Sequence, residues 1–254
     1  MRLNGKTALV TGSTSNIGWA IAVGFAAEGA HVIVSGRNRE RGEQIVADIR
    51  ADGGKADFVA ADLDGSPARS RELAAEATRL LGGRLDILVN NAGIYPGTTT
   101  ASTDEQTVDR MLGVNVKAPY FLTGAIAPAM AERRYGVIIN LGSWVARLGL
   151  GIGTFYAATK GAVETLTRAW SAEYGPSGVR VNGISPGVIR TPDLDPSVPH
   201  PAESMMFGTP AGSTGTPQAI AAAAVYLASD DAAFVHGTVI DVDGGRIGAA
   251  VIAG

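Results

Sequence analysis

The sequence has no cysteine among its 254 residues. This absence excludes disulfides, thiolate nucleophiles and cysteine-ligated zinc sites. Histidine is also scarce, and no two of the three histidines (His31, His200 and His236) are spaced three or four residues apart, as a pair of ligands on one helix would be. We therefore expect no metal site.

Charged residues are few, with 21 basic and 24 acidic side chains and a net charge of −3. A nucleic-acid partner would require a basic face that replaces the phosphate counterions, so none is expected. The longest uncharged apolar stretch, residues 219–228, is about half of what a membrane span needs. The N-terminus contains Lys6 and a turn residue at Gly12, which leaves no room for a signal-peptide core. These features predict a cytoplasmic protein with no membrane partner.

Glycine and apolar residues are abundant, with 34 glycines and 46% hydrophobic residues, enough to form a sizeable core. Short β-branched runs alternate with amphipathic helical patterns, and several runs are apolar at successive positions, as in strands covered on both faces. The predicted strands are 7–12, 31–36, 56–62, 85–90, 136–141, 179–184 and 238–242. Ser66-Pro67 and Thr216-Pro217 predict two helix starts. The alternation predicts an α/β fold over residues 1–254: a single Rossmann-type doubly wound parallel sheet of about seven strands, with helices on both faces.

One segment differs in composition from the rest of the chain. Residues 192–217 hold half of the 12 prolines, and they also contain Met205, Met206 and Phe207. A long segment with many prolines inside a compact domain is typical of a functional lid. We expect a substrate lid over about 192–216 that becomes ordered around bound ligands.

A loop with the sequence TGSTSNIG follows the first predicted strand, over residues 11–18. The chain must turn sharply there and bring backbone N–H groups and a helix N-terminus to face an anion. Gly12 can take the turn, and Gly18 lets the helix pack close to the sheet. The literal G-x-G-x-x-G pattern is incomplete, so an ordinary strand-to-helix turn is the alternative. The position between a strand and a helix favours phosphate binding.

This loop resembles the TGxxxGxG loop of the short-chain dehydrogenase/reductase family, and further matches follow in the family's order along nearly the whole chain. They are NNAG at 90–93, Pro186-Gly187, VDGG at 242–245, and the four residues at the catalytic tetrad positions, Asn115, Ser143, Tyr156 and Lys160. The sequence departs from the family at Asn16, where a glycine is usual. Because Asn tolerates positive φ well, the turn is expected to survive, with the side chain either crowding the cofactor or bonding to it.

The spacing of Tyr156 and Lys160 places them one above the other on a helix. An ammonium beside a phenol lowers its pKa from about 10. Tyr156 could then give a proton to a carbonyl oxygen or take one from an alcohol. Ser143 follows the strand 136–141 and would hydrogen-bond the substrate oxygen. The resemblance implies that Lys160 also holds the nicotinamide ribose and that Asn115 holds a water linking Lys160 to solvent. Each residue alone has an ordinary structural explanation, and the complete set favours catalysis.

The end of the second predicted strand bears on the choice of nicotinamide. A site that prefers NAD carries an acidic residue there for the ribose 2′-hydroxyl, whereas this chain has Gly36 followed by Arg37. A guanidinium can bind a 2′-phosphate, so NADP(H) is expected and NAD(H) is less favoured. Arg39 or Arg41 could assist, or these arginines could simply be a solvated helix start.

The resemblance implies further cofactor contacts, with Asp62 toward the adenine amino group and Ile189 and Thr191 toward the carboxamide and phosphates. The complete predicted cofactor set is Gly12, Ser15, Asn16, Ile17, Gly18, Arg37, Asp62, Leu63, Asn91, Ala92, Gly93, Tyr156, Lys160, Pro186, Gly187, Ile189 and Thr191.

Substrate contacts are expected from residues 144–155 and from the lid. These segments supply many apolar side chains: Trp144, Leu148, Leu150, Ile152, Phe155, Met205, Met206 and Phe207. Charges near them are few: Arg147, Asp193, Asp195 and Glu203. A small apolar ketone or secondary alcohol fits this composition better than a sugar phosphate or a dicarboxylate. The alternative is that many of these side chains form lid core or a subunit interface.

The sequence thus predicts an NADP(H)-dependent short-chain oxidoreductase. A 3-oxoacyl-thioester reductase is the nearest alternative, because the C-terminal half resembles that subgroup; it would call for a basic entrance patch, which only the Arg133-Arg134 pair could supply. A non-catalytic nucleotide-sensing protein of the same fold is a third reading, and the intact tetrad disfavours it. A homotetramer or homodimer is expected, because Val163, Leu166 and Trp170 resemble the family's subunit-packing face.

Overall fold

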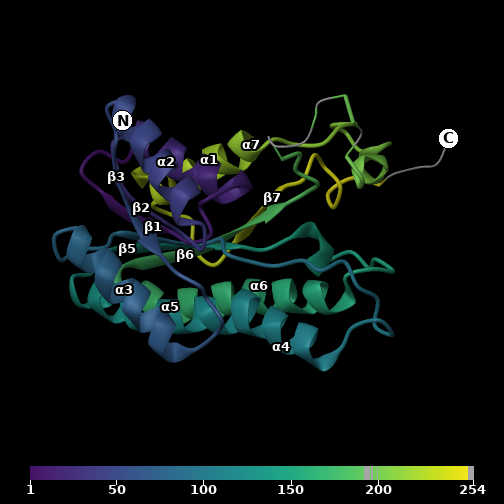
Figure 1. The fold of residues 1–254 in the computed structure, drawn as a ribbon, viewed down its shortest axis with the longest axis horizontal. Helices are drawn as coiled ribbons and strands as arrows, with labels where there is room; N and C mark the ends of the chain where they lie inside the picture. Colours follow the sequence, from purple (N-terminus) through teal and green to yellow (C-terminus); the bar gives the residue numbers. More distant parts are fainter. Residues whose placement is uncertain (192–194, 196, 199, 251–254) are drawn as a thin grey trace.

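The structure, a computed structural model, describes residues 1–191, 195, 197–198 and 200–250. Within these residues, parallel strands form a seven-stranded sheet in the order β3-β2-β1-β4-β5-β6-β7 (Figure 1). The strands are β1 (Thr7–Val10), β2 (His31–Gly36), β3 (Lys55–Ala60), β4 (Ile87–Asn90), β5 (Gly136–Leu141), β6 (Val179–Pro186) and β7 (Val239–Val242). This arrangement confirms the predicted doubly wound sheet, and each strand lies within about two residues of its predicted range.

Helices cover the sheet on both faces, with α1, α2 and α7 above it and α3, α5 and α6 below it in Figure 1. Their bounds are α1 (Asn16–Ala27), α2 (Arg39–Ala51), α3 (Pro67–Leu80), α4 (Glu105–Leu112), α5 (Ala118–Glu132), α6 (Thr154–Tyr174) and α7 (Pro217–Ala228). The two predicted Pro starts are confirmed, and the Ser66 hydroxyl caps α3 by accepting from the backbone of Arg69. Among the described residues, none of the helices has both the length and the apolar character that a bilayer crossing requires.

Two hydrophobic cores explain why the strands are apolar at successive residues. Val10 and Val34 belong to the core beneath α1 and α7, whereas Leu9 and Ile33 belong to the core beneath α3 and α5. Alternate residues of one strand point to opposite faces, so a strand covered on both faces needs apolar side chains throughout.

The strand order reverses between β1 and β4, because the chain leaves β3 at one edge and returns to the middle of the sheet. In such sheets the loops on either side of the reversal diverge, which opens a crevice at the carboxyl ends of the strands. The predicted site residues lie mostly at the carboxyl ends of β1 to β6, in the loops that follow them, and in the first turns of α1 and α6, so the topology brings them to one edge.

The predicted lid is described only in part, because residues 192–194, 196 and 199 lie outside the described residues, and Asp193 with them. The described part contains a short 3-10 helix, η4 (Glu203–Met206). Met206 is buried against Trp144 and Val188, so this part of the segment packs directly on the loop that follows β5.

Two of the three residues predicted to resemble a subunit-packing face on α6 are buried within the chain, and Leu166 is half-buried. Val163 is 2% exposed and Trp170 is 4% exposed, and Trp170 packs in the chain's own core beside Val181. These side chains are already covered within one chain, so they are not a reason to expect subunit contact.

Candidate functional site

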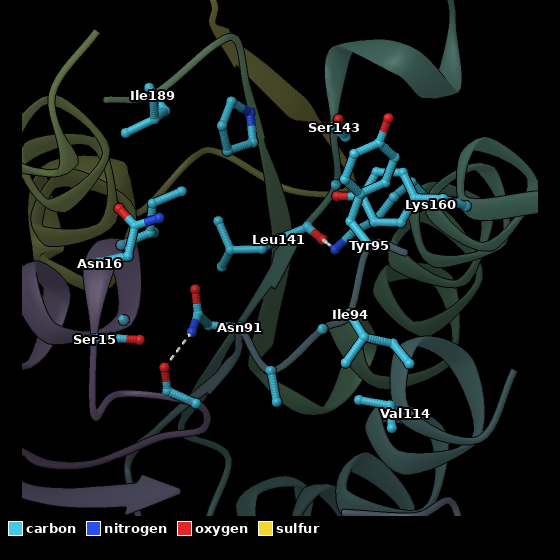
Figure 2. A pocket seen from close by; sticks show the side chains of 18 of the residues that line it. Ser15, Asn16, Asn91, Ile94, Tyr95, Val114, Leu141, Ser143, Lys160 and Ile189 are labelled. Carbon is cyan, nitrogen blue, oxygen red and sulfur yellow. Dashed lines mark hydrogen bonds between the residues drawn. The ribbon is translucent and has the colours of Figure 1, made fainter. Parts of the chain in front are cut away.

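A cavity of about 1120 Å³ runs across the carboxyl ends of the strands. Figure 2 shows Ser15 and Asn16 on one side of it, Ser143 and Lys160 on the other, and Asn91 between them. The cavity therefore joins the glycine loop to Ser143, Tyr156 and Lys160, which lie more than a hundred residues further along the sequence.

The glycine loop packs tightly against the segment that follows β4. Gly12 has φ +62°, and a Cβ there would lie 2.9 Å from Ala92 Cα. A Cβ on Gly18 would lie 2.4 Å from Gly12 O, closer than real contacts allow. The Asn91 side chain donates to Thr11 O at 2.8 Å and thereby ties the two segments together. Both predicted roles are confirmed: Gly12 makes the turn, and Gly18 permits the close approach.

The start of α1 offers unused hydrogen-bonding groups to the cavity. Asn16 adopts φ +49°, which confirms that Asn can stand at the family's glycine position. Its Oδ1 atom is buried without a hydrogen-bond partner, and the Ser15 side chain makes no capping bond to α1. A helix N-terminus with uncapped N–H groups favours an anion. The uncapped helix start fits the phosphates of a dinucleotide, whereas the Asn16 oxygen can only accept from a donor such as a hydroxyl.

One end of the cavity, at Arg37 and Asp62, is where the adenosine of a dinucleotide is expected, and it is called the adenosine end. It is built from exposed side chains. Arg37 and Asp62 are both exposed and both line the cavity. Arg39 pairs instead with Glu43 at 3.1 Å and lies over the ring of Phe58, so it stabilises α2. Arg37 lines the cavity, whereas Arg39 does not.

The other end of the cavity, at Ser143, Tyr156 and Lys160, is called the catalytic end. It is built from groups on α6 and on the turn after β5. Lys160 is 6% exposed, and its Nζ donates to Leu141 O at 2.7 Å (Figure 2). Nζ lies 5.7 Å from the centre of the Tyr156 ring. Ser143 is also buried, and its hydroxyl is close enough to bond the Tyr156 phenol. The structure thus brings the three predicted residues together.

The expected effect on the Tyr156 pKa is not seen. Burial raises the pKa of Tyr156 to about 12, and the hydrogen bond from Ser143 opposes this shift only in part. Burial also lowers the pKa of Lys160 to about 8, against the favourable charge of Glu164. Desolvation disfavours both charged forms, and it raises the pKa of Tyr156 where the sequence led us to expect that a neighbouring ammonium would lower it. In this structure Tyr156 is a protonated phenol at neutral pH.

Asn115 lies in a π-helical turn (Gly113–Lys117) between α4 and α5, rather than in a regular helix. Its Oδ1 accepts from the backbone N–H of Ile94 at 2.8 Å, and its Nδ2 donates to Ile94 O and to the Thr159 hydroxyl. Such turns occur often at functional sites. Asn115 therefore holds the segment after Gly93 against α6, and the predicted water link stays a prediction.

Tyr95 is a wall residue that the sequence analysis missed. Its ring stands edge-on to the Tyr156 ring with the centroids 4.9 Å apart, and it is 55% exposed. A Cβ on Gly153 would lie 2.6 Å from the Tyr95 ring, so Tyr95 also contacts the loop before α6. The only available signal was its place two residues after NNAG, which does not indicate the direction of a side chain.

The cavity wall includes all predicted cofactor residues except Thr191. Among the predicted substrate residues, Trp144, Leu150, Ile152 and Met205 line it. Leu148, Phe155, Met206 and Phe207 do not: Met206 is buried beneath Trp144, and Phe207 is 64% exposed. The apolar wall residues outside the predicted positions and segments are Ala61, Ile94, Tyr95, Val114, Leu141 and Val188.

The geometry places the Arg133-Arg134 pair, the only candidate for a basic entrance patch. Arg133 bonds to Leu85 O just before β4, so the Arg133-Arg134 pair lies at the amino ends of the strands, opposite the cavity. It cannot form an entrance patch. In the part of the chain that the structure describes, no group of three or more acidic or histidine side chains is placed to hold a metal ion.

A family model described as enoyl-(acyl carrier protein) reductase matches residues 12–246. The cyclopentanol dehydrogenase of Comamonas testosteroni is 36% identical over 246 residues, covering 96% of this chain and 98% of that protein. The 3-oxoacyl-[acyl-carrier-protein] reductase FabG of Thermotoga maritima is 34% identical over 247 residues, covering 97% of this chain and 100% of that protein.

Among solved structures, a gluconate 5-dehydrogenase from Burkholderia cenocepacia J2315, in complex with NADP and tartrate, superimposes with a TM-score of 0.89. It is 33% identical and covers 98% of each chain. The family-model match and relatives above 30% identity over nearly the whole chain agree with the sheet order and the site. This chain belongs to the short-chain dehydrogenase/reductase family of oxidoreductases.

Proposed function

We propose that this protein is an NADP(H)-dependent oxidoreductase that interconverts a small apolar ketone and the corresponding secondary alcohol. The observation that carries the proposal is the single cavity in which the glycine loop faces Ser143, Tyr156 and Lys160. A nucleotide held along this loop would extend from the adenosine end toward the catalytic end.

The cofactor assignment rests on the chain's own groups. The uncapped N–H groups at the start of α1 would hold the phosphates, and Arg37 would meet a 2′-phosphate. Lys160 would bond the nicotinamide ribose, as the family resemblance implies. When bound, the nicotinamide supplies or accepts the hydride. The NADP in the related gluconate 5-dehydrogenase supports this choice.

Tyr156 would act as the proton donor during reduction. Because its pKa is about 12, the phenol carries its proton at neutral pH and can donate it to a carbonyl oxygen. Ser143 would bond the same oxygen and orient it toward Tyr156. The cationic form of Lys160 would stabilise the phenolate that is left. Removal of the charge on Lys160 should therefore slow reduction.

The substrate class rests on the walls of the cavity near Tyr156. The apolar side chains that line it include Tyr95, Trp144, Val145, Leu150, Ile152, Val188 and Met205. Arg147, the nearest basic side chain of the loop after β5, is turned to Asp241 and Glu164 and is not available to a substrate anion. The relatives carry names with different substrates, so the lining is the better guide.

A substrate panel tests the proposal. Cyclopentanone, a keto acid and acetoacetyl-coenzyme A would each be offered with NADPH and with NADH, and kcat/KM compared. We expect the highest value for the cyclic ketone with NADPH. A preference for the thioester would instead support the 3-oxoacyl-thioester reductase function, which the relative from Thermotoga maritima favours. No turnover of any carbonyl would contradict both.

We further propose that the chain works in the cytoplasm as a homotetramer or homodimer. Val163 and Trp170 are buried, and the oligomer is instead supported by exposed aromatic side chains. Tyr120 is 51% exposed beside Trp170, and Phe234 is fully exposed. Sedimentation at micromolar concentration should show an oligomer, and a stable monomer would contradict this.

A further inference from the structure

A buried carboxylate lies one helical turn beyond the catalytic lysine. Glu164 follows Lys160 by four residues on α6, so the two lie on the same helix face. Glu164 is only 5% exposed, and its Oε1 atom is buried with no hydrogen-bond partner. Acidic side chains are almost never fully buried unless they are paired, so this position calls for an explanation.

Glu164 is in contact with the turn that carries Ser143. A Cβ on Gly142 would lie 2.8 Å from Glu164 Oε1, so any larger residue at 142 would collide with the carboxylate. Burial raises the pKa of Glu164, and the Ser143 backbone N–H, which faces the carboxylate, opposes this rise. Lys160 holds the preceding residue through its bond to Leu141 O. Lys160 and Glu164, one helical turn apart on α6, therefore contact Leu141, Gly142 and Ser143 in succession.

An arginine from the following loop completes the arrangement. Arg147 Nε lies 3.5 Å from Glu164 Oε2, and Arg147 Nη1 donates to Asp241 on β7 at 3.0 Å. Arg147 comes immediately after a 3-10 helix, η2 (Trp144–Ala146), that contributes two residues to the cavity wall. The four charged groups alternate in sign from the catalytic site to the sheet edge: Lys160, Glu164, Arg147 and Asp241.

We propose that Glu164 is a positioning residue, which together with Arg147 holds the turn at residues 141–143 so that Ser143 and Lys160 keep their places beside Tyr156. The inference rests on the proposed function of this cavity. It adds to the tetrad a carboxylate that touches neither substrate nor cofactor and acts through its neighbours.

The arrangement has a consequence for the pH dependence of the reaction. The charged groups that act on Glu164 are Lys160 and Arg168 on α6, Arg147 after η2, and Asp241 on β7. The negative charge of Glu164 raises the pKa of Lys160 against the effect of burial. Without this charge the lysine should lose its proton at a lower pH, and reduction should decline earlier on the basic side.

Two variants separate the charge of Glu164 from its shape. Glu164→Leu removes both, and kcat should fall at least about tenfold while the dissociation constant of NADPH, measured by fluorescence, stays within about threefold. Glu164→Gln keeps the shape and an acceptor for the Ser143 N–H, and it should recover much of the kcat. In both variants the basic limb of the kcat profile should move to lower pH by at least half a unit. Glu72→Leu, an exposed position on α3, is the matched control.

The inference is overturned if Glu164→Leu keeps kcat within twofold, or if kcat falls without any movement of the basic limb. If Glu164→Leu does not fold, the test is the pH at which kcat of Glu164→Gln declines on the basic side, compared with the wild type. Tyr156→Phe is assayed alongside. Normal turnover in that variant would contradict the proposed function, whereas its inactivity beside normal Glu164 variants would contradict only the positioning role.

Discussion

The two ends of the cavity are built in different ways. At the adenosine end, Arg37 and Asp62 are exposed, and the loop at Gly12 presents backbone. At the catalytic end, Lys160 and Ser143 are buried and held by bonds from several elements. An exposed group that contacts a ligand contributes mainly to affinity, and a buried group contributes mainly through a fixed geometry and a shifted pKa. Substitutions should therefore affect binding at the first end and rate at the second.

The largest effect is expected at the catalytic end. Tyr156→Phe removes the proton donor and keeps the ring that packs against Tyr95. General acid–base catalysis contributes about 10²–10⁴ in rate, so kcat should fall by at least about 10². Steady-state kinetics measures the loss, and the dissociation constant of NADPH should stay near that of the wild type. A variant with near-normal kcat would remove Tyr156 from the reaction.

The next largest effect is expected at the adenosine end. Arg37→Ala should weaken NADPH by about 1.5–3 kcal/mol, the range for a charged hydrogen bond, which is about 10- to 150-fold in affinity. NADH binding and the kcat at saturating NADPH should change little. Arg39→Ala is the control, because Arg39 pairs with Glu43 on α2. Equal losses for NADPH and NADH would mean that Arg37 does not meet a 2′-phosphate.

The third prediction concerns pH and again addresses the catalytic end. Lys160 has a lowered pKa of about 8, so its stabilising charge is present below that pH and is lost above it. The kcat for reduction should be nearly constant near neutral pH, and it should fall by up to about tenfold per pH unit above pH 8. Lys160→Arg keeps a charge at all these pH values, and it should remove the decline even if the rate is lower. A wild-type profile that is flat to pH 10 would contradict the assignment.

The smallest effect is expected at Tyr95, where the catalytic end opens to solvent. An edge-to-face ring contact is worth about 0.5–1.5 kcal/mol, so Tyr95→Ala should lower kcat/KM for an apolar ketone by about two- to tenfold. Tyr95→Phe keeps the ring and should behave like the wild type. An equal loss in the phenylalanine and alanine variants would show that the hydroxyl, and not the ring, is what matters.

Much of the fold was predictable because its signals are local. Unbroken apolar runs mark strands covered on both faces, and a residue at the end of such a strand must lie at the sheet edge where the cavity forms. The four-residue spacing of Tyr156 and Lys160 likewise places them on one helix face without any knowledge of the rest of the chain. These features depend on backbone geometry, which neighbouring residues determine.

Other properties were decided only by the tertiary structure. Tyr95 reaches Tyr156 because two loops converge, and Glu164 reaches Arg147 and Gly142 because α6, β5 and the following loop pack together. The direction of the Tyr156 pKa was predicted wrongly because burial, which a spacing does not reveal, has the larger effect. Trp170 was predicted to belong to a subunit-packing face, and it packs in the chain's own core. The sequence by itself determined which residues meet the sheet edge, and packing determined what surrounds them, because desolvation and contacts between distant segments arise only when the chain is folded.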